Sequence, residues 1–198
     1  MAFRIEPMSP ADTAAVVALQ VAFLDGSIVT QLGPRFLTRM HMLTLQHEST
    51  RAYVARDVQG GGILGFAVAS VDVHAYNQYV KPRVLPSLVQ ALLLPPRIGL
   101  LGAFARMAAE GEPQPPIDAE LLLLTVDARA RRQGVGRALL EAIEAAFAAH
   151  GVSRYRVAVR SQLAEARAFY SASAFEHEQE RQVLGRPMVY LTKQVVRH

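Results

Sequence analysis

Hydrophobic and polar positions show their clearest pattern between Leu121 and Gly151. Five of the six residues in Leu121–Val126 are apolar, and so short a run between charged residues is typical of a buried central strand. A helical spacing of apolar residues follows, at Leu139, Ile143 and Phe147. This spacing, with Gly151 after it, predicts an amphipathic helix that ends at the glycine. Gly134 and Gly136 would then lie at the N-terminus of that helix.

Shorter patterns predict the other strands and helices. Two apolar stretches, Ala52–Ala55 and Ile63–Val71, flank a glycine-rich turn, which predicts a β-hairpin. Further strands are predicted at Phe3–Ile5, Tyr155–Val159, His177–Val183 and Met188–Val195. Further helices are predicted after the start signal Ser9-Pro10, from Pro34 to about Leu45, and from Ala166 to Ala172. Helices and strands interleaved in this way indicate an α/β domain.

Residues 72–119, between the hairpin and the central strand, contain two apolar segments separated by prolines. Each segment has its own helical face, formed by Leu85, Leu88 and Leu92 in the first and by Ile98, Leu101 and Ala105 in the second. Neither segment reaches the ~18 uninterrupted apolar residues of a transmembrane helix. We therefore expect a helical insertion and no stable membrane insertion. Its apolar faces would form a lid over an acceptor, a homodimer interface or additional core.

The predicted helix N-terminus has the composition of a phosphate-binding turn. The first turn of a helix leaves backbone N–H groups without internal partners and carries partial positive charge. Arg129, Arg131 and Arg132 precede the two glycines, which let a phosphate approach the backbone closely. A diphosphate fits such a turn. The alternative is a purely structural tight turn before an amphipathic helix.

Two common phosphate-binding loops do not fit this stretch. The mononucleotide loop requires Gly-x-x-x-x-Gly-Lys-Ser/Thr, which the sequence lacks. The dinucleotide fingerprint fails at its third glycine, where Leu139 stands, and Arg156 takes the place of an acidic ribose ligand about 20 residues on. A nucleotide- or dinucleotide-binding protein is therefore disfavoured.

A third pattern, Arg/Gln-x-x-Gly-x-Gly/Ala, is met. It is formed by Arg131, Gly134 and Gly136, with Leu124-Thr125-Val126 before it and Arg137-Ala138-Leu139-Leu140 after it. Downstream, the spacing Asn-x-x-Ala-x-x-Phe/Leu-Tyr-x-x-x-Gly-Phe is matched by Ala166, Phe169, Tyr170 and Phe175, with Leu163 and Ala174 in the Asn and Gly positions. Together these stretches resemble the GCN5-related N-acetyltransferase (GNAT) superfamily, whose members bind acetyl-CoA at such a turn.

The resemblance implies an α/β (α+β) fold in which a mixed, mostly antiparallel twisted sheet of about seven strands is flanked by helices. It implies one N-acetyltransferase domain over residues 1–198, with the helical insertion between strands 3 and 4. Strands 4 and 5 would split to admit acetyl-CoA. The reaction would move an acetyl group from acetyl-CoA to a primary amine of a small molecule or peptide. A non-catalytic acyl-CoA-binding sensor on the same fold is the alternative, and the acceptor and the acyl-chain preference stay open.

The cofactor contacts of the family carry over to one strand end, one turn and one aromatic residue. These positions are Leu124, Thr125, Val126, Arg131, Arg132, Gln133, Gly134, Val135, Gly136, Arg137, Ala138 and Phe169. By the resemblance, the backbone of the strand-4 end would pair with the pantetheine arm. The turn would hold the diphosphate.

Two residues are candidate catalytic groups by the same resemblance. Tyr170 matches the tyrosine that relatives place near the sulfur as general acid, and a phenol with an ordinary pKa near 10 is protonated at neutral pH. The alternative is a core aromatic residue beside Phe169. Glu120 would be the base that deprotonates the amine, or else a solvated residue at the mouth of a buried strand. By the period of two, it would share a face with Leu122, Leu124 and Val126.

Composition narrows the chemistry further. The formal net charge of +4 suits an anionic cofactor, and no zinc knuckle or RNA-binding aromatic motif supports nucleic-acid binding. The chain has no cysteine, so a thiol nucleophile is excluded and direct transfer within a ternary complex is the simpler mechanism. The six histidines show no metal-binding spacing. We therefore expect that the protein needs no metal. The N-terminus has no signal-peptide core, so we expect a cytoplasmic protein.

Overall fold

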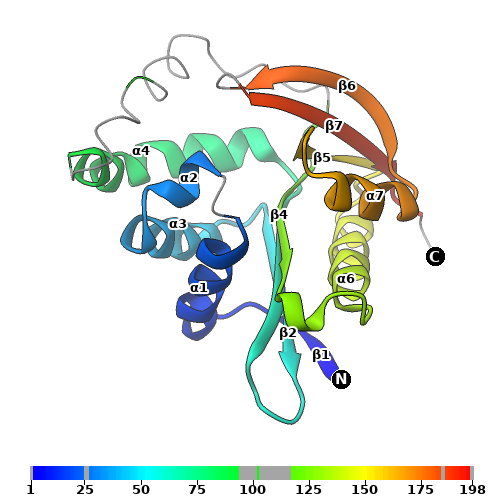
Figure 1. The fold of residues 1–198 in the computed structure, drawn as a ribbon. Coiled ribbons are helices and arrows are strands. Elements are labelled where there is room, and N and C mark those ends of the chain that lie inside the picture. The colour runs from blue at the N-terminus through cyan, green and yellow to red at the C-terminus, as the bar shows by residue number, and fades with distance from the viewer. Residues whose placement is uncertain (1, 25–26, 94–101, 103–116, 184–185, 197–198) are drawn as a thin grey trace.

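The structure is a computed structural model that describes residues 2–24, 27–93, 102, 117–183 and 186–196. Its described strands form one seven-stranded sheet in the order β1-β2-β3-β4-β5-β7-β6 (Figure 1). They are β1 (Phe3–Pro7), β2 (Thr50–Asp57), β3 (Ile63–Ser70), β4 (Glu120–Val126), β5 (Arg154–Arg160), β6 (Glu176–Val183) and β7 (Arg186–Gln194). Every neighbouring pair is antiparallel except β4–β5, which is parallel. The predicted fold class is confirmed.

Helices cover both faces of this sheet. In chain order they are η1 (Pro10–Asp12), α1 (Thr13–Phe23), α2 (Ile28–Gln31), α3 (Pro34–Gln46), α4 (Val73–Leu92), η3 (Ala128–Ala130), α6 (Val135–Ala149) and α7 (Ala164–Ala172). Figure 1 shows α1, α3 and α4 on one face and α6 and α7 on the other. The every-fourth pattern that predicted α6 is its buried face, because Leu139, Ile143 and Phe147 all lie in the core between α6 and the sheet. Each layer of helices thus has a core of its own.

The helical insertion between the third and fourth strands is present as α4. Asp72 caps its N-terminus, since the carboxylate accepts a hydrogen bond from the Ala75 backbone N–H at 2.8 Å. Leu88 and Leu92 pack in a cluster with residues of α3, so this part of the insertion adds to the core. The second predicted segment, around Ile98, Leu101 and Ala105, lies outside the described residues.

One prediction about α4 is wrong, because Leu85 does not share the buried face of Leu88 and Leu92. The face packed on α3 is set by Tyr76, Val80 and Val84, which recur every four residues. A helix rotates by about 100° per residue, so the residue after Val84 points away from this face. Leu85 is accordingly 55% exposed.

A β-bulge corrects the prediction for β4. In the pairing with β3, Val68 is opposite Leu123 and Ala69 is opposite Leu121, so Leu122 is an extra residue. Leu122 and Leu123 consequently both pack toward the helices α1 and α3, whereas Leu124 and Val126 pack toward α6 with Leu121. Glu120 therefore does not share a face with Leu124 and Val126, as the period of two had predicted.

A buried polar network joins the helices of the α1–α3 layer. The Nε2 atom of His41 on α3 lies 2.7 Å from Oε1 of Gln20 on α1, and Nε2 of Gln20 donates to Oγ1 of Thr30 on α2 at 3.4 Å. The imidazole also contacts the ring of Phe66 on β3 edge to face. Burial lowers the pKa of His41 from 6.5 to about 4, so this side chain is neutral in the folded protein at neutral pH.

Candidate functional site

The two central strands of the sheet separate along most of their length. β4 and β5 pair only at Glu120 with Arg156 and at Leu121 with Val157. From Leu122 onward, the edge of β4 that faces β5 has no strand partner among the described residues. Backbone N–H and C=O groups on such an edge are available to a bound ligand. The predicted split between strands 4 and 5 is present, and Leu124, Thr125 and Val126 line the open end of it.

A tight turn follows β4 directly. Asp127 begins it by capping the short helix η3 (Ala128–Ala130), where its carboxylate accepts a hydrogen bond from the Arg129 backbone N–H at 2.9 Å. The Arg129 guanidinium lies 2.7 Å from the same carboxylate, and its hydrogen bond lowers the pKa of Asp127. The chain then reverses through Arg132 and Gly134, whose φ angles are 59° and 84°. Gly134 suits this left-handed conformation because it has no Cβ.

Gly134 is also the N-cap of α6 and places free donors at the end of the split. The N–H groups of Val135, Gly136 and Arg137 belong to the first turn, where no intrahelical acceptor exists, and the cap residue supplies no side-chain oxygen. The helix dipole adds partial positive charge there. Arg132 and Arg137 are exposed beside it. The turn therefore has the donors and the charge that an anionic group requires.

Gly136 is the point at which the strand end, the turn and α7 meet. A Cβ added to it would lie 3.4 Å from Cε2 of Phe169 and 3.7 Å from Cγ2 of Val126. The structure thus brings together the cofactor residues expected from three separate stretches. Among them, Val135 can contribute only its backbone, because its side chain is buried in the core.

Arg131 bridges the turn to neighbouring elements. Its Nε donates to the Val126 carbonyl oxygen at 3.3 Å, and its guanidinium stands over the ring of Phe23 at the end of α1, 5.2 Å from the centroid. A weak ion pair of 3.8 Å joins it to Glu165 on α7. The side chain is therefore anchored at the open end of β4.

Gly65 on β3 supports the site and was not singled out from the sequence as a site residue. A Cβ there would lie 2.8 Å from the Thr125 carbonyl oxygen and 3.3 Å from Cδ1 of Leu139. Glycine at this position lets α6 pack closely over β3 and the end of β4. The available signal was a glycine inside an apolar strand, which often marks a close backbone approach.

Tyr170 lies in an aromatic cluster beside the split. Its ring centroid is 5.2 Å from that of Phe169 and 5.0 Å from that of Phe175, and the residue is only 6% exposed. Burial raises the pKa of Tyr170 above the ordinary value of 10, so its phenol keeps its proton throughout the neutral range. A role as proton donor and a role as core aromatic residue are both compatible with this position.

Glu120 forms an ion pair with Arg156 at the closed end of the split. Oε2 of the carboxylate accepts from Nε and Nη2 of the guanidinium at 2.8 and 2.5 Å, and both side chains are little exposed, at 13% and 12%. The guanidinium also lies 5.2 Å from the ring centroid of Tyr190 on β7. The expectation of a merely solvated Glu120 is therefore wrong.

Glu120 and Tyr170 approach the split from opposite faces of the sheet. Leu121 and Val157 pack in the same core as Tyr170. Because successive residues of a strand alternate between faces, the neighbours of those two residues, Glu120 and Arg156, point to the other face. Glu120, at the closed end of the split, and Tyr170 therefore lie on opposite faces of the sheet.

Comparison with known protein families identifies a family for the part of the chain that forms this site. Residues 104–193 match the acetyltransferase (GNAT) domain family. These residues carry a GNAT acetyltransferase domain. No curated protein has significant sequence similarity to it.

Solved structures share the fold of the GNAT domain over nearly the whole chain. SsHAT has a TM-score of 0.72 at 20% identity, with 99% of this chain and 100% of that chain covered. The ribosomal-protein-S18-alanine N-acetyltransferase from Escherichia coli has a TM-score of 0.59 at 17% identity, covering 98% and 94%. PaiA N-acetyltransferase from Thermoplasma acidophilum, solved in complex with coenzyme A, has a TM-score of 0.62 at 14% identity, covering 98% and 99%.

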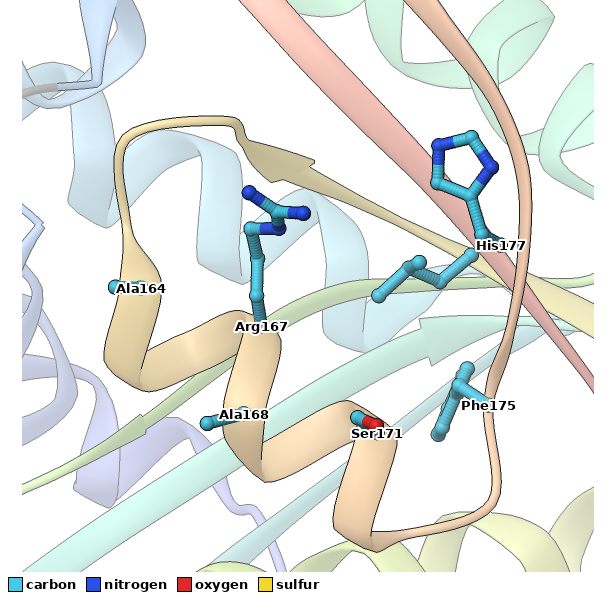
Figure 2. Close-up of a pocket in the computed structure, with 7 residues that line it drawn as sticks. Ala164, Arg167, Ala168, Ser171, Phe175 and His177 are labelled. Atoms are coloured by element: carbon cyan, nitrogen blue, oxygen red, sulfur yellow. The ribbon is translucent and has the colours of Figure 1, made fainter.

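The GNAT domain also has a pocket on the far flank of α7. Its volume is about 370 Å³, and its lining consists of Ala164, Arg167, Ala168, Ser171, Phe175, His177 and Leu191 (Figure 2). Arg167 and His177 both extend toward the opening between α7 and β6. A turn of about 100° per residue places Phe169 on the other side of α7 from Ala164, Ala168 and Ser171. The pocket contains none of the residues expected in the site.

Two further properties concern the described residues only. No helix among them is long and apolar enough to span a membrane. No group of three or more histidine, aspartate or glutamate side chains among them could hold a metal ion.

Proposed function

We propose that this single-domain protein transfers an acetyl group from acetyl-CoA to a primary amine of a small molecule or peptide. The observation that carries the proposal is the split between β4 and β5, which ends at the N-terminal turn of α6. Acetyl-CoA has an extended arm with amide groups and a diphosphate, and both match groups that line this split. The amide groups suit an unpaired strand edge, and the diphosphate suits a helix N-terminus.

The chain's own residues would hold acetyl-CoA in two ways. The backbone of Leu124, Thr125 and Val126 would pair with the pantetheine amides along the open edge. The turn from Arg131 to Ala138 would hold the diphosphate, with the free N–H groups of Val135, Gly136 and Arg137 donating to its oxygens and Arg132 and Arg137 adding charge. Phe169 would pack against the arm where it passes Gly136.

Acetyl transfer then requires one bond to form and one to break. The neutral amine attacks the thioester carbonyl carbon, a C–N bond forms, the C–S bond breaks, and the CoA thiolate leaves and takes up a proton. The chain has no cysteine to carry the acetyl group, which supports direct transfer within a ternary complex. Tyr170 would supply or share a proton with the thiolate, since its phenol stays protonated.

Glu120 would act on the other face of the sheet, and the amine would then approach from that face. Its position opposite Tyr170 suits removal of the amine proton, directly or through water. Its hydrogen bonds from Arg156, at 2.8 and 2.5 Å, would hold the carboxylate in position. The identity of the acceptor is left open, although one protein of the same fold acts on the alanine of a ribosomal protein.

The first test is calorimetric titration with acetyl-CoA, CoA and NADPH, followed by thiol release over a panel of amines. A protein without cysteine adds no thiol of its own, so the release signal reports turnover alone. We expect selective binding of acetyl-CoA and CoA, with release on one class of amine. Absence of CoA binding would overturn the proposal, and tight binding without turnover on any amine would favour a sensor.

A glycine pair supplies a variant and its control. Gly136→Val would push branched carbons into Phe169 and Val126, so we expect the Kd for acetyl-CoA to rise by roughly tenfold or more. Gly62→Val, in the β2–β3 turn where an added Cβ meets nothing within 4 Å, should leave the Kd unchanged. Equal Kd values in the two variants would place the cofactor elsewhere.

A further inference from the structure

The pocket between α7 and β6 has no part in the reaction proposed above. Its volume of about 370 Å³ is typical of small-molecule sites in proteins. Phe175 and Leu191 line it and are each 7% exposed, because both belong to the core between the helices and the sheet. Ala164 and Ala168 extend this apolar lining along α7. The pocket can therefore hold an apolar group the size of a benzene ring.

Three polar side chains line the same pocket. Arg167 and Ser171 come from α7 and His177 comes from β6, and Figure 2 shows Arg167 and His177 extending toward the opening from opposite walls. A guanidinium is always charged, and a hydroxyl and an imidazole each carry a hydrogen-bond donor. No aspartate or glutamate is among the described residues that line the pocket. The lining therefore favours an anion over a cation.

The guanidinium of Arg167 has donors to spare. Within the described part of the chain it makes one hydrogen bond, from Nη1 to the carbonyl oxygen of Ser161 at 3.3 Å. This acceptor is neutral, and no carboxylate forms an ion pair with Arg167 among the described side chains. The remaining N–H groups form a planar fork that matches the two oxygens of a carboxylate. A bound carboxylate would therefore supply the counter-charge that the described chain does not.

We infer that this pocket binds a small carboxylic acid with an apolar body. The carboxylate pairs with Arg167, close to the donors of the other two polar side chains, and the apolar body covers Phe175 and Leu191. A bare inorganic anion suits the pocket less well, because it leaves the apolar lining without contact. The site is separate from the one proposed for acetyl-CoA, since Phe169 lies on the other side of α7. The inference therefore does not depend on acetyl transfer.

The test is an NMR titration of the isotope-labelled full-length protein with benzoate, which combines a carboxylate with an apolar ring. We expect saturable shifts of the backbone amides of α7 and β6, with a Kd of roughly 1 mM, as expected for a ligand of so few atoms. Benzyl alcohol has the same ring without the charge, and inorganic phosphate has charge without the ring. Each should bind roughly tenfold more weakly than benzoate. Saturating CoA should leave the Kd for benzoate unchanged.

Two variants locate the site, and a third is their control. Arg167→Gln removes the charge and should raise the Kd for benzoate roughly tenfold, and Ala168→Phe should abolish binding because the new ring fills the pocket. Arg39→Gln, on α3 at the other face of the sheet, should leave the Kd unchanged. All three positions are exposed, so circular dichroism should show folded proteins.

The inference is overturned by the absence of saturable shifts in α7 and β6, or by binding of benzyl alcohol or phosphate as tight as that of benzoate. Equal Kd values for Arg167→Gln and Arg39→Gln would also overturn it. Displacement of benzoate by CoA would do the same, because the pocket would then belong to the cofactor site.

Discussion

The buried imidazole of His41 should make the stability of the protein depend on pH in the mildly acidic range. Burial lowers the pKa of this side chain from 6.5 to about 4, so the unfolded chain binds a proton between these values that the folded chain does not. Stability therefore falls as the pH falls below 6.5. From pH 7.5 to pH 5 the loss attributable to His41 is about 2 kcal/mol, because one pKa unit corresponds to about 1.4 kcal/mol.

The loss of stability between pH 7.5 and pH 5 can be assigned to His41 from the groups around it. Its ring faces the neutral Gln20 and the edge-to-face contact with Phe66. Asp12 and Asp127 also titrate differently in the folded protein, but their pKa values are lowered from 3.8. Their stabilisation is lost only as the pH falls through that lower range, below the window of the experiment.

Urea unfolding followed by circular dichroism at pH 7.5, 6.5 and 5.0 measures the effect. The unmodified protein should lose about 2 kcal/mol more than His41→Gln between the two extremes. Equal losses in the two proteins would refute the reasoning. Should His41→Gln not fold, an NMR titration of the unmodified protein gives the same answer: an imidazole that gains its proton near pH 6.5 would contradict the buried neutral state.

Three further predictions concern the site. Tyr170→Phe should lower kcat by roughly 100-fold and leave the Kd for acetyl-CoA unchanged, whereas an unchanged kcat would make Tyr170 a core residue only. In the unmodified enzyme, kcat should not fall through ionisation of Tyr170 below pH 10, since burial raises the pKa of this phenol. Gly65→Ala should destabilise the fold by about 1–3 kcal/mol, because the new methyl would meet the Thr125 carbonyl oxygen at 2.8 Å. Urea unfolding should show no such loss in Gly62→Ala, and equal unfolding midpoints of the two variants would contradict the close packing at Gly65. Ala168→Phe should fill the pocket beside β6 and change the Kd for acetyl-CoA by less than about twofold, since Phe169 lies on the other side of α7. A much higher Kd would indicate that the cofactor binds in that pocket.

Patterns within one element were a reliable guide to the fold. Apolar runs, turn signals and alternation predicted all seven described strands, and helical spacing predicted the buried face of α6, because burial of one face fixes the period of a helix. The turn after β4 was also predictable, since glycine at a left-handed position and donors at a helix N-terminus are local properties.

Features that depend on a distant partner were not predictable in this way. The bulge at Leu122 is set by the register against β3, and one extra residue moves every later side chain to the other face. The exposure of Leu85 depends on which side of α4 packs against α3. The ion pair of Glu120 and Arg156 joins residues 36 positions apart, and no local pattern links them.

The short pairing between β4 and β5 divides the sheet into two ladders, β1–β4 and β5–β7–β6. Each ladder is continuous within itself, whereas in the part of the chain that the structure describes two residue pairs and the ion pair of Glu120 with Arg156 join their edges. In native-state hydrogen exchange, such halves are expected to open as separate cooperative units. A ligand that contacts both β4 and β5 adds its binding free energy to the contact between the two ladders. Such a ligand would make the two ladders unfold as one unit.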